Sequence, residues 1–324
     1  MIYDNILDTI GNTPLVRLNR FSAEVPPTIL GKVERFNPAG SVKERVSWAI
    51  IEDMEQRGEI KPGGIVVEAT SGNMGVGVAM VCAARGYGCI IVMPSKMSME
   101  RERIIRAFGG KVVRTRSDVP WDHPESFLNT ARRITKETPG AVMLNQFYNQ
   151  VNPQIHYRTT AQEIWNATEG KIDAFVAGMG TGGTITGVGK FLKEKNPNIQ
   201  IIGADPVGSS LKHLFDTGEM REGEFYHVEG IGEDFMPETL RFDHVDRMFY
   251  VADNDSFRMA RKLARSEGIF AGGSTGTILC ATMEYARTMG KDQTIVAMLC
   301  DNGERYLSKF YNEDWCKEMG FDTD

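Results

Sequence analysis

The chain has 324 residues, of which 41% are hydrophobic and 25% are charged, a globular composition with room for two domains. Its formal net charge of −6 is unfavourable for binding nucleic acid, and no apolar stretch is long enough to cross a bilayer. Because the first residues also lack the pattern of a signal peptide, we expect a cytoplasmic protein that acts on small molecules, with no nucleic-acid or membrane partner.

The first informative segment, residues 37–45, predicts a turn followed by a helix. Its proline and glycine favour the turn, and Ser41 can cap a helix that runs to Gly58. Lys43 then lies in the first helical turn, where the positive end of the helix dipole favours its neutral amine. A neutral amine is what a Schiff base requires. A lysine at a helix start is more often a solvated charge, so this interpretation depends on the motifs further along.

Three runs rich in valine and isoleucine predict parallel strands over residues 65–68, 89–93 and 111–114. Helical segments that start near Gly75 and Ser98 separate them, which gives one βαβαβ unit. The loop at residues 70–75 offers hydroxyls, an amide and helix-terminal N–H groups that could hold a substrate carboxylate. The alternative is ordinary helix capping, which needs only one of those side chains.

A second series of strands is predicted over residues 174–177, 201–204 and 294–299, with an amphipathic helix at 257–267. We therefore expect an α/β fold with two mostly parallel, twisted sheets flanked by helices. Ligands bind beyond the carboxyl ends of such strands, so the loops after Glu68, Ala177 and Leu299 are where chemistry is expected. Residues 205–246 form the longest stretch without clear periodicity.

The most distinctive motif is Gly-Met-Gly-Thr-Gly-Gly-Thr at residues 178–184, placed between a strand and a helix. Glycines let backbone N–H groups close on an anion at a helix N-terminus, which indicates a phosphate site. The motif also fits G-x-G-x-x-G, and Asp205 follows where a ribose-binding acid belongs, so a dinucleotide-dependent dehydrogenase is a rival. Two threonine hydroxyls among three glycines favour a single terminal phosphate. Residues 272–276 have the same Gly-rich setting.

The cysteines show no Cys-x-x-Cys spacing and the histidines show no metal-ligand spacing, so we expect free, mostly buried thiols and no metal site. A role for Cys300 stays open, because it lies at a strand end beside Asp301.

Together these loops resemble the fold-type II pyridoxal-phosphate enzymes of the cysteine synthase and cystathionine β-synthase family, most closely the catalytic core of cystathionine β-synthases. The resemblance extends from residues 10–15 to Arg305-Tyr306, and also includes residues 89–94. Residues 121–126 and 229–235 favour the cystathionine β-synthases over the cysteine synthases. It implies a fold like that of the tryptophan synthase β-subunit, with a larger cofactor-binding domain over 1–40 and 148–324 and a smaller domain over 41–147.

The resemblance also implies pyridoxal 5'-phosphate as cofactor, with Lys43 as both the catalytic residue and the Schiff-base lysine. Asn73 would meet the ring hydroxyl and Ser274 the pyridine nitrogen. The phosphate would be held by Gly180, Thr181, Gly182, Gly183 and Thr184, and the substrate carboxylate by Thr70, Ser71, Gln146 and Met74, the last through its backbone. No haem is expected, since no haem-binding extension precedes the core, and the relatives imply a homodimer.

The implied reaction is β-replacement on serine or an activated serine through an aminoacrylate, with homocysteine as the thiol and cystathionine as the product. Cysteine synthesis with sulfide, hydrogen sulfide release from cysteine and a diaminopropionate-type synthesis are alternatives. A non-enzymatic small-molecule sensor is a further alternative. Met74 replaces a threonine of many relatives and Phe147 replaces a tyrosine usual in cystathionine β-synthases. Phe147, Glu229 and residues 205–246 are candidates for choosing the second substrate.

Overall fold

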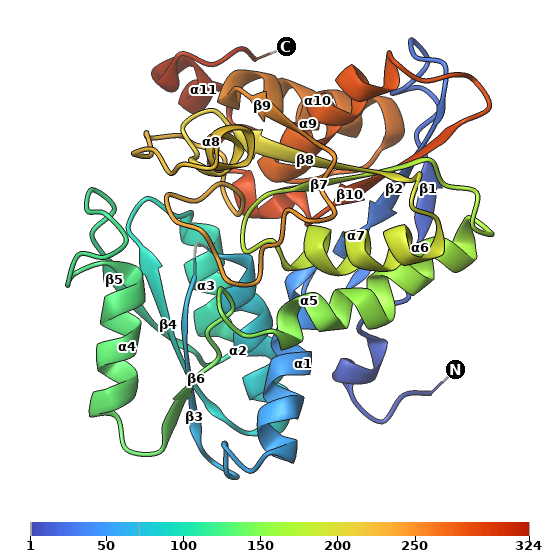
Figure 1. Ribbon diagram of the computed structural model, residues 1–324. Helices are drawn as coiled ribbons and strands as arrows, with labels where there is room; N and C mark the ends of the chain where they lie inside the picture. The colour runs from blue at the N-terminus through green and yellow to red at the C-terminus, as the bar shows by residue number, and fades with distance from the viewer. Residues whose placement is uncertain (1, 71, 324) are drawn as a thin grey trace.

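The computed structural model describes residues 2–70 and 72–323, and within these residues the chain forms two β-sheets flanked by helices (Figure 1). The larger sheet has the strand order β1-β2-β10-β7-β8-β9, and the smaller sheet has the order β5-β4-β3-β6. All neighbouring strands are parallel except β1 and β2, which pair antiparallel. The predicted fold class is therefore confirmed.

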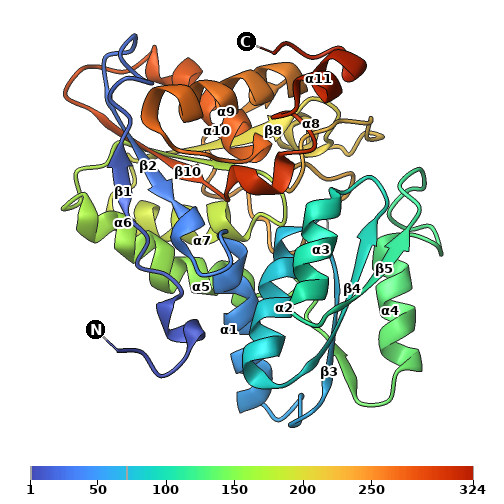
Figure 2. The same cartoon turned by 180° about the vertical axis from the view of Figure 1, so that it is seen from behind.

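The smaller sheet contains the predicted βαβαβ unit. Its elements are, in chain order, β3 (Ile65–Ala69), α2 (Asn73–Arg85), β4 (Gly88–Pro94), α3 (Met99–Ala107), β5 (Lys111–Thr115), α4 (Phe127–Glu137) and β6 (Ala141–Met143). Helix α4 covers one face, α2 and α3 lie on the other, and α1 (Lys43–Gln56) packs against α2 (Figure 2). Because helices cover both faces, the apolar strands β3 and β4 are almost entirely buried.

The larger sheet combines the other three predicted strands with three that the sequence did not indicate. Its strands are β1 (Leu15–Arg17), β2 (Thr28–Val33), β7 (Ala174–Gly178), β8 (Gln200–Pro206), β9 (Arg247–Val251) and β10 (Thr294–Leu299). Helices α9 (Asp253–Glu267) and α10 (Gly273–Ala286) lie on one side of this sheet, and α7 (Gly183–Lys195) lies on the other (Figure 1). The remaining helical elements are η1 (Ile6–Thr9), η2 (Glu34–Phe36), α5 (Val151–Ile155), the π-helical η3 (His156–Thr160), α6 (Ala161–Ala167), α8 (Leu211–Thr217), η4 (Gly303–Tyr306) and α11 (Glu313–Met319).

The start of α1 differs slightly from the prediction. The N-cap position is occupied by Val42 instead of Ser41, and the helix ends at Gln56. Ser41 still serves the helix start, because its hydroxyl accepts a hydrogen bond from the Lys43 N–H at 3.2 Å. Its own N–H and hydroxyl donate to the buried Glu44 carboxyl, so the turn is fixed from both sides.

The loops after β3, β7 and β10 meet where the two sheets approach each other, since residues of all three line one pocket. Residues 205–246 begin with the last two residues of β8, contain α8 and are otherwise irregular, and Gly230, Ile231 and Glu233 within them line the same pocket. The domain boundaries expected near residues 40 and 147 stay a prediction. No helix in the described part of the chain is both long and apolar enough to span a membrane.

Candidate active site

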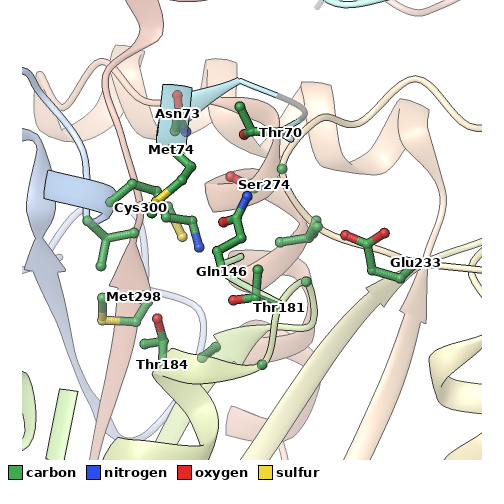
Figure 3. Close-up of a pocket in the computed structure, with 18 of the residues that line it drawn as sticks. Thr70, Asn73, Met74, Gln146, Thr181, Thr184, Glu233, Ser274, Met298 and Cys300 are labelled. Atoms are coloured by element: carbon green, nitrogen blue, oxygen red, sulfur yellow. The ribbon is translucent and has the colours of Figure 1, made fainter. Parts of the chain in front are cut away.

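One pocket gathers side chains from each of the loops that the sequence singled out (Figure 3). Of the predicted site residues, its lining includes Lys43, Thr70, Asn73, Met74, Gln146, Gly180, Thr181, Gly182, Thr184 and Ser274. Gly183 is buried at the first position of α7 and does not line it. Ser71 lies outside the described residues. The predicted residues therefore converge in space although they are separated by up to 231 positions along the chain.

The amine of Lys43 projects from the first residue of α1 into this pocket. Burial lowers the pKa of this amine, which nearby Glu233 opposes only in part. The pKa of the amine is thus lowered mainly by desolvation, whereas the sequence had pointed to the helix dipole as the cause. Among the described residues no side chain accepts a hydrogen bond from the amine, which leaves it free to act as a nucleophile or base.

The Gly-rich loop at residues 178–184 presents an uncapped helix N-terminus to the pocket. The N–H groups of the first turn of α7 have no intrahelical acceptor and the N-cap residue provides no side-chain cap; the Gly183 N–H makes only a long hydrogen bond, 3.4 Å, to the Thr181 hydroxyl. Gly182 has a φ of +79°, and a Cβ added at Gly180 would lie 2.9 Å from the Gly230 carbonyl oxygen. Glycine is therefore required at both positions. Thr181 and Thr184 add hydroxyls at the same end of the pocket (Figure 3).

A buried histidine that the sequence did not indicate stands behind this loop. His156 Nε2 lies 3.3 Å from the Thr184 hydroxyl, and its Nδ1 lies 2.9 Å from the Thr160 hydroxyl. Burial, assisted by the charges of Arg45 and Lys43, lowers the pKa of His156 to about 3. The imidazole is neutral at physiological pH. The π-helical turn that carries it is a feature often found near functional sites.

The loop after β3 presents a second uncapped helix N-terminus at the opposite end of the pocket (Figure 3). Gly72 has a φ of +144° and lies so close to Arg101 that a side chain is excluded there. The Thr70 hydroxyl accepts a hydrogen bond from the Gly72 N–H at 3.0 Å, and Gln146 donates to the Ala69 carbonyl oxygen. The N–H groups of α2 and these side chains could bind a carboxylate.

Asn73 is fixed from behind by a cluster of buried ionic residues. Its Nδ2 donates to Asp301 at 2.7 Å, and its Oδ1 accepts from Arg305. Arg101 of α3 pairs with Glu229 and lies 2.5 Å from the Tyr306 hydroxyl. The sequence indicated Glu229 and the 305–306 pair only through the resemblance. No local pattern marks Arg101, because Glu229 and Tyr306, with which it makes its closest contacts, lie more than 120 positions away.

The donor set fits pyridoxal phosphate. It contains an amine that has no hydrogen-bond partner among the described residues, a Gly-rich helix N-terminus with two hydroxyls for a phosphate, and a third helix without a side-chain cap, α10, that places Ser274 in the pocket. The dinucleotide-binding alternative requires a carboxylate that can bind a ribose, but Asp205 does not line the pocket. Its carboxyl group instead accepts a hydrogen bond from the Lys212 N–H at 2.9 Å. Burial raises the pKa of Asp205 to about 7, consistent with a structural position.

Comparisons with known sequences point the same way. A sequence model of the family described as "Pyridoxal-phosphate dependent enzyme" matches residues 6–301. The cystathionine beta-synthase of Apis mellifera is 45% identical over 322 residues, which cover 99% of this chain and 64% of that protein. That of Rattus norvegicus is also 45% identical over 322 residues, covering 99% of this chain and 57% of the relative. The chain thus spans less than two thirds of these relatives.

Two solved structures are similar over nearly the whole chain. A hydrogen sulfide-producing enzyme from Fusobacterium nucleatum is 36% identical with a TM-score of 0.88, covering 94% of this chain and 100% of that chain. O-ureido-L-serine synthase is 38% identical with a TM-score of 0.88, covering 96% of this chain and 95% of that chain. These similar proteins therefore have names that describe different reactions, although the two solved structures share one fold.

Proposed function

The chain belongs to the family of pyridoxal-phosphate-dependent enzymes, and from that premise we propose that it replaces the β-substituent of serine, or of an activated serine, with a thiol. The thiol is homocysteine and the product is cystathionine. With serine, the Cβ–O bond breaks, a Cβ–S bond forms, and the hydroxyl leaves with the thiol proton as water. The observation that carries the proposal is the Lys43 amine, which has no hydrogen-bond partner in the described part of the chain and lies in one pocket with the N-terminus of α7.

In this proposal the cofactor is held by four groups of residues. Lys43 would form the covalent bond, Asn73 would contact the ring hydroxyl and Ser274 would contact the ring nitrogen. The phosphate is bound by Gly180, Thr181, Gly182, Gly183 and Thr184. Pyridoxal phosphate, when bound, supplies a conjugated ring that accepts electrons from the substrate Cα.

The chain's own groups move the proton and hold the substrate. Lys43 Nζ takes the proton from Cα and later returns it, a role favoured by the burial that lowers the pKa of this amine. Thr70, Gln146 and the N–H of Met74 orient the substrate carboxylate, and Ser71 of the same loop is assigned there by the resemblance. Met74 contributes its backbone because its side chain is buried, with the sulfur 3.3 Å from the Ser47 hydroxyl.

A second candidate follows from the structural neighbours, whose names describe hydrogen sulfide production and O-ureido-L-serine synthesis. Phe147 is buried in the lining of the pocket, with its ring edge-on to the ring of Phe235. A phenylalanine offers no hydroxyl at this position that could select homocysteine. Cysteine synthesis from sulfide, hydrogen sulfide release from cysteine, or replacement with another small nucleophile is therefore the alternative. The homodimer, the cytoplasmic location and the absence of haem stay predictions.

A product assay tests the proposal. The purified holoenzyme is incubated with serine, O-acetylserine or cysteine, each with homocysteine or with sulfide, and the products are identified by mass spectrometry. We expect cystathionine from at least one donor and none from Lys43→Ala. Formation of cysteine or hydrogen sulfide without cystathionine from any donor would support the second candidate instead.

A further inference from the structure

Glu233 occupies a position between two cavities. It lines the pocket of Lys43, and it also lines a wider groove bordered by Lys96, Trp121 and Tyr226. Among the cavities recorded for the described residues, this groove alone shares lining residues with the pocket, namely Gly230, Ile231 and Glu233. We call it the entrance groove. A second substrate that reaches the pocket through this groove must pass Glu233.

The backbone of Glu233 is fixed while its carboxyl group is free. Its carbonyl oxygen accepts hydrogen bonds from the Ser210 N–H at 3.0 Å and the Ser209 hydroxyl at 3.2 Å. Its N–H donates to the Ser209 hydroxyl at 3.2 Å. Within the described part of the chain, its carboxyl group has neither a hydrogen bond nor an ion pair. The backbone of Glu233 is thus held in place by hydrogen bonds, and its carboxyl group remains available to bind a substrate group.

The charges around Glu233 do not neutralise it. Lys96 and Lys43 attract its charged form, while Asp234 and Asp205 repel it, and neither lysine lies within ion-pair distance of the carboxyl. Burial, together with Asp234, raises the pKa of the carboxyl to about 8. A cation bound beside the carboxyl would favour its charged form. By contrast, Arg116 at the rim of the groove already pairs with Asp118 at 2.9 Å.

We propose that Glu233 selects the nucleophilic substrate by accepting hydrogen bonds from the α-ammonium group of an amino-acid thiol, an inference that rests on the proposed function. Lys96 lines the same groove with its ammonium above the Phe225 and Tyr226 rings and no carboxylate partner within ion-pair distance among the described residues. A carboxyl group that a bound cation would hold in its charged form and an unpaired ammonium group along one groove complement a zwitterion. Sulfide has no ammonium group, so Glu233 would not favour it.

The test compares Glu233→Gln with the wild type, using two thiols that differ by one amino group. At a saturating serine donor, the thiols are homocysteine and 4-mercaptobutanoate, which is homocysteine without its ammonium. We expect KM for homocysteine to rise about ten-fold in Glu233→Gln, because a hydrogen bond between charged groups is lost. KM for 4-mercaptobutanoate and KM for serine stay unchanged, and Glu233→Asp lies between the wild type and Glu233→Gln.

Glu238→Gln is the matched control, since this exposed carboxylate on the same segment lines neither cavity. Thermal unfolding and cofactor content of all variants are measured alongside. An equal change in KM for the two thiols, or no change for either, would overturn the role of Glu233. If the wild type makes no thioether from any donor, the proposed function itself fails. If the wild type is active but Glu233→Gln has the same KM values, only the role of Glu233 fails.

Discussion

At the scale of single residues, the hydroxyl of Thr184 depends on the buried imidazole of His156. If the Thr184 hydroxyl is to donate to a phosphate, His156 Nε2 must carry the proton and donate to it across their 3.3 Å separation. Because its pKa is about 3, the imidazole stays neutral across the physiological range. It can therefore orient Thr184 without adding a charge that varies with pH.

We expect His156→Leu to weaken the affinity for pyridoxal phosphate about ten-fold, the effect of losing one buried hydrogen bond partner. Fluorescence titration of the apoenzyme with the cofactor measures the change. Thr184→Val should weaken binding by a similar factor, and the double variant should be little worse than either, because both remove the same interaction. Additive losses in the double variant would show that His156 acts on the loop by another route.

At the scale of elements, helix α3 is joined to the C-terminal segment by ionic contacts. The guanidinium of Arg101 pairs with Glu229, stacks on the Tyr306 ring, and lies 4.0 Å from Asp301. Glu229 also pairs with Lys309, whose pKa is lowered to about 8 by burial and by the charge of Arg101. Since Asp301 holds Asn73, this contact supports one wall of the pocket.

We expect Arg101→Met to lower the free energy of unfolding by about 3 kcal/mol, because it leaves the Glu229 and Asp301 carboxylates buried with one fewer cation. Arg106→Met on the same helix is the control, since its pair with Glu102 is at the surface and should cost less than about 1 kcal/mol. Urea unfolding at pH 7 measures both. Equal losses in the two variants would contradict a special role for Arg101.

These contacts also explain what the sequence could and could not predict. Strands such as β3 and β4 were predictable because burial on both faces leaves a continuous apolar run, and Lys43 was predictable because its turn and helix start are local. Strand β6 has three half-buried residues, and the π-helical turn at His156 depends on packing against α7. Arg101 and Glu233 gain their surroundings only when distant segments meet, so no local pattern reveals them.

At the scale of the whole molecule, a second ionic cluster joins α1, near the smaller sheet, to β2 and α6 of the larger part. Arg45 pairs with Glu34 at 2.7 Å and with Glu163 at 2.6 Å, and Lys32 also binds Glu163. Burial alone would raise the pKa of the Glu163 carboxyl, but Arg45 and Lys32 outweigh it and hold the pKa at about 2. The cluster therefore keeps its charges well into the acid range.

The depressed pKa of Glu163 makes the stability of the molecule depend on pH. Its contribution is complete above its ordinary value of 4.5 and is lost as the pH falls toward 2, because the unfolded chain binds the proton first. We expect Glu163→Gln to lower the free energy of unfolding by about 3 kcal/mol at pH 7, since Arg45 and Lys32 lose their shared anion. Between pH 4.5 and 2 the variant should lose less further stability than the wild type.

Urea unfolding at pH 7, 4 and 3 measures both effects. Glu169→Gln is the control, because its pair with Lys171 is fully exposed to solvent and should leave the stability nearly unchanged at every pH. If the wild type and Glu163→Gln lost stability in parallel on acidification, the charge of Glu163 would not be what holds α1 against the larger sheet at low pH.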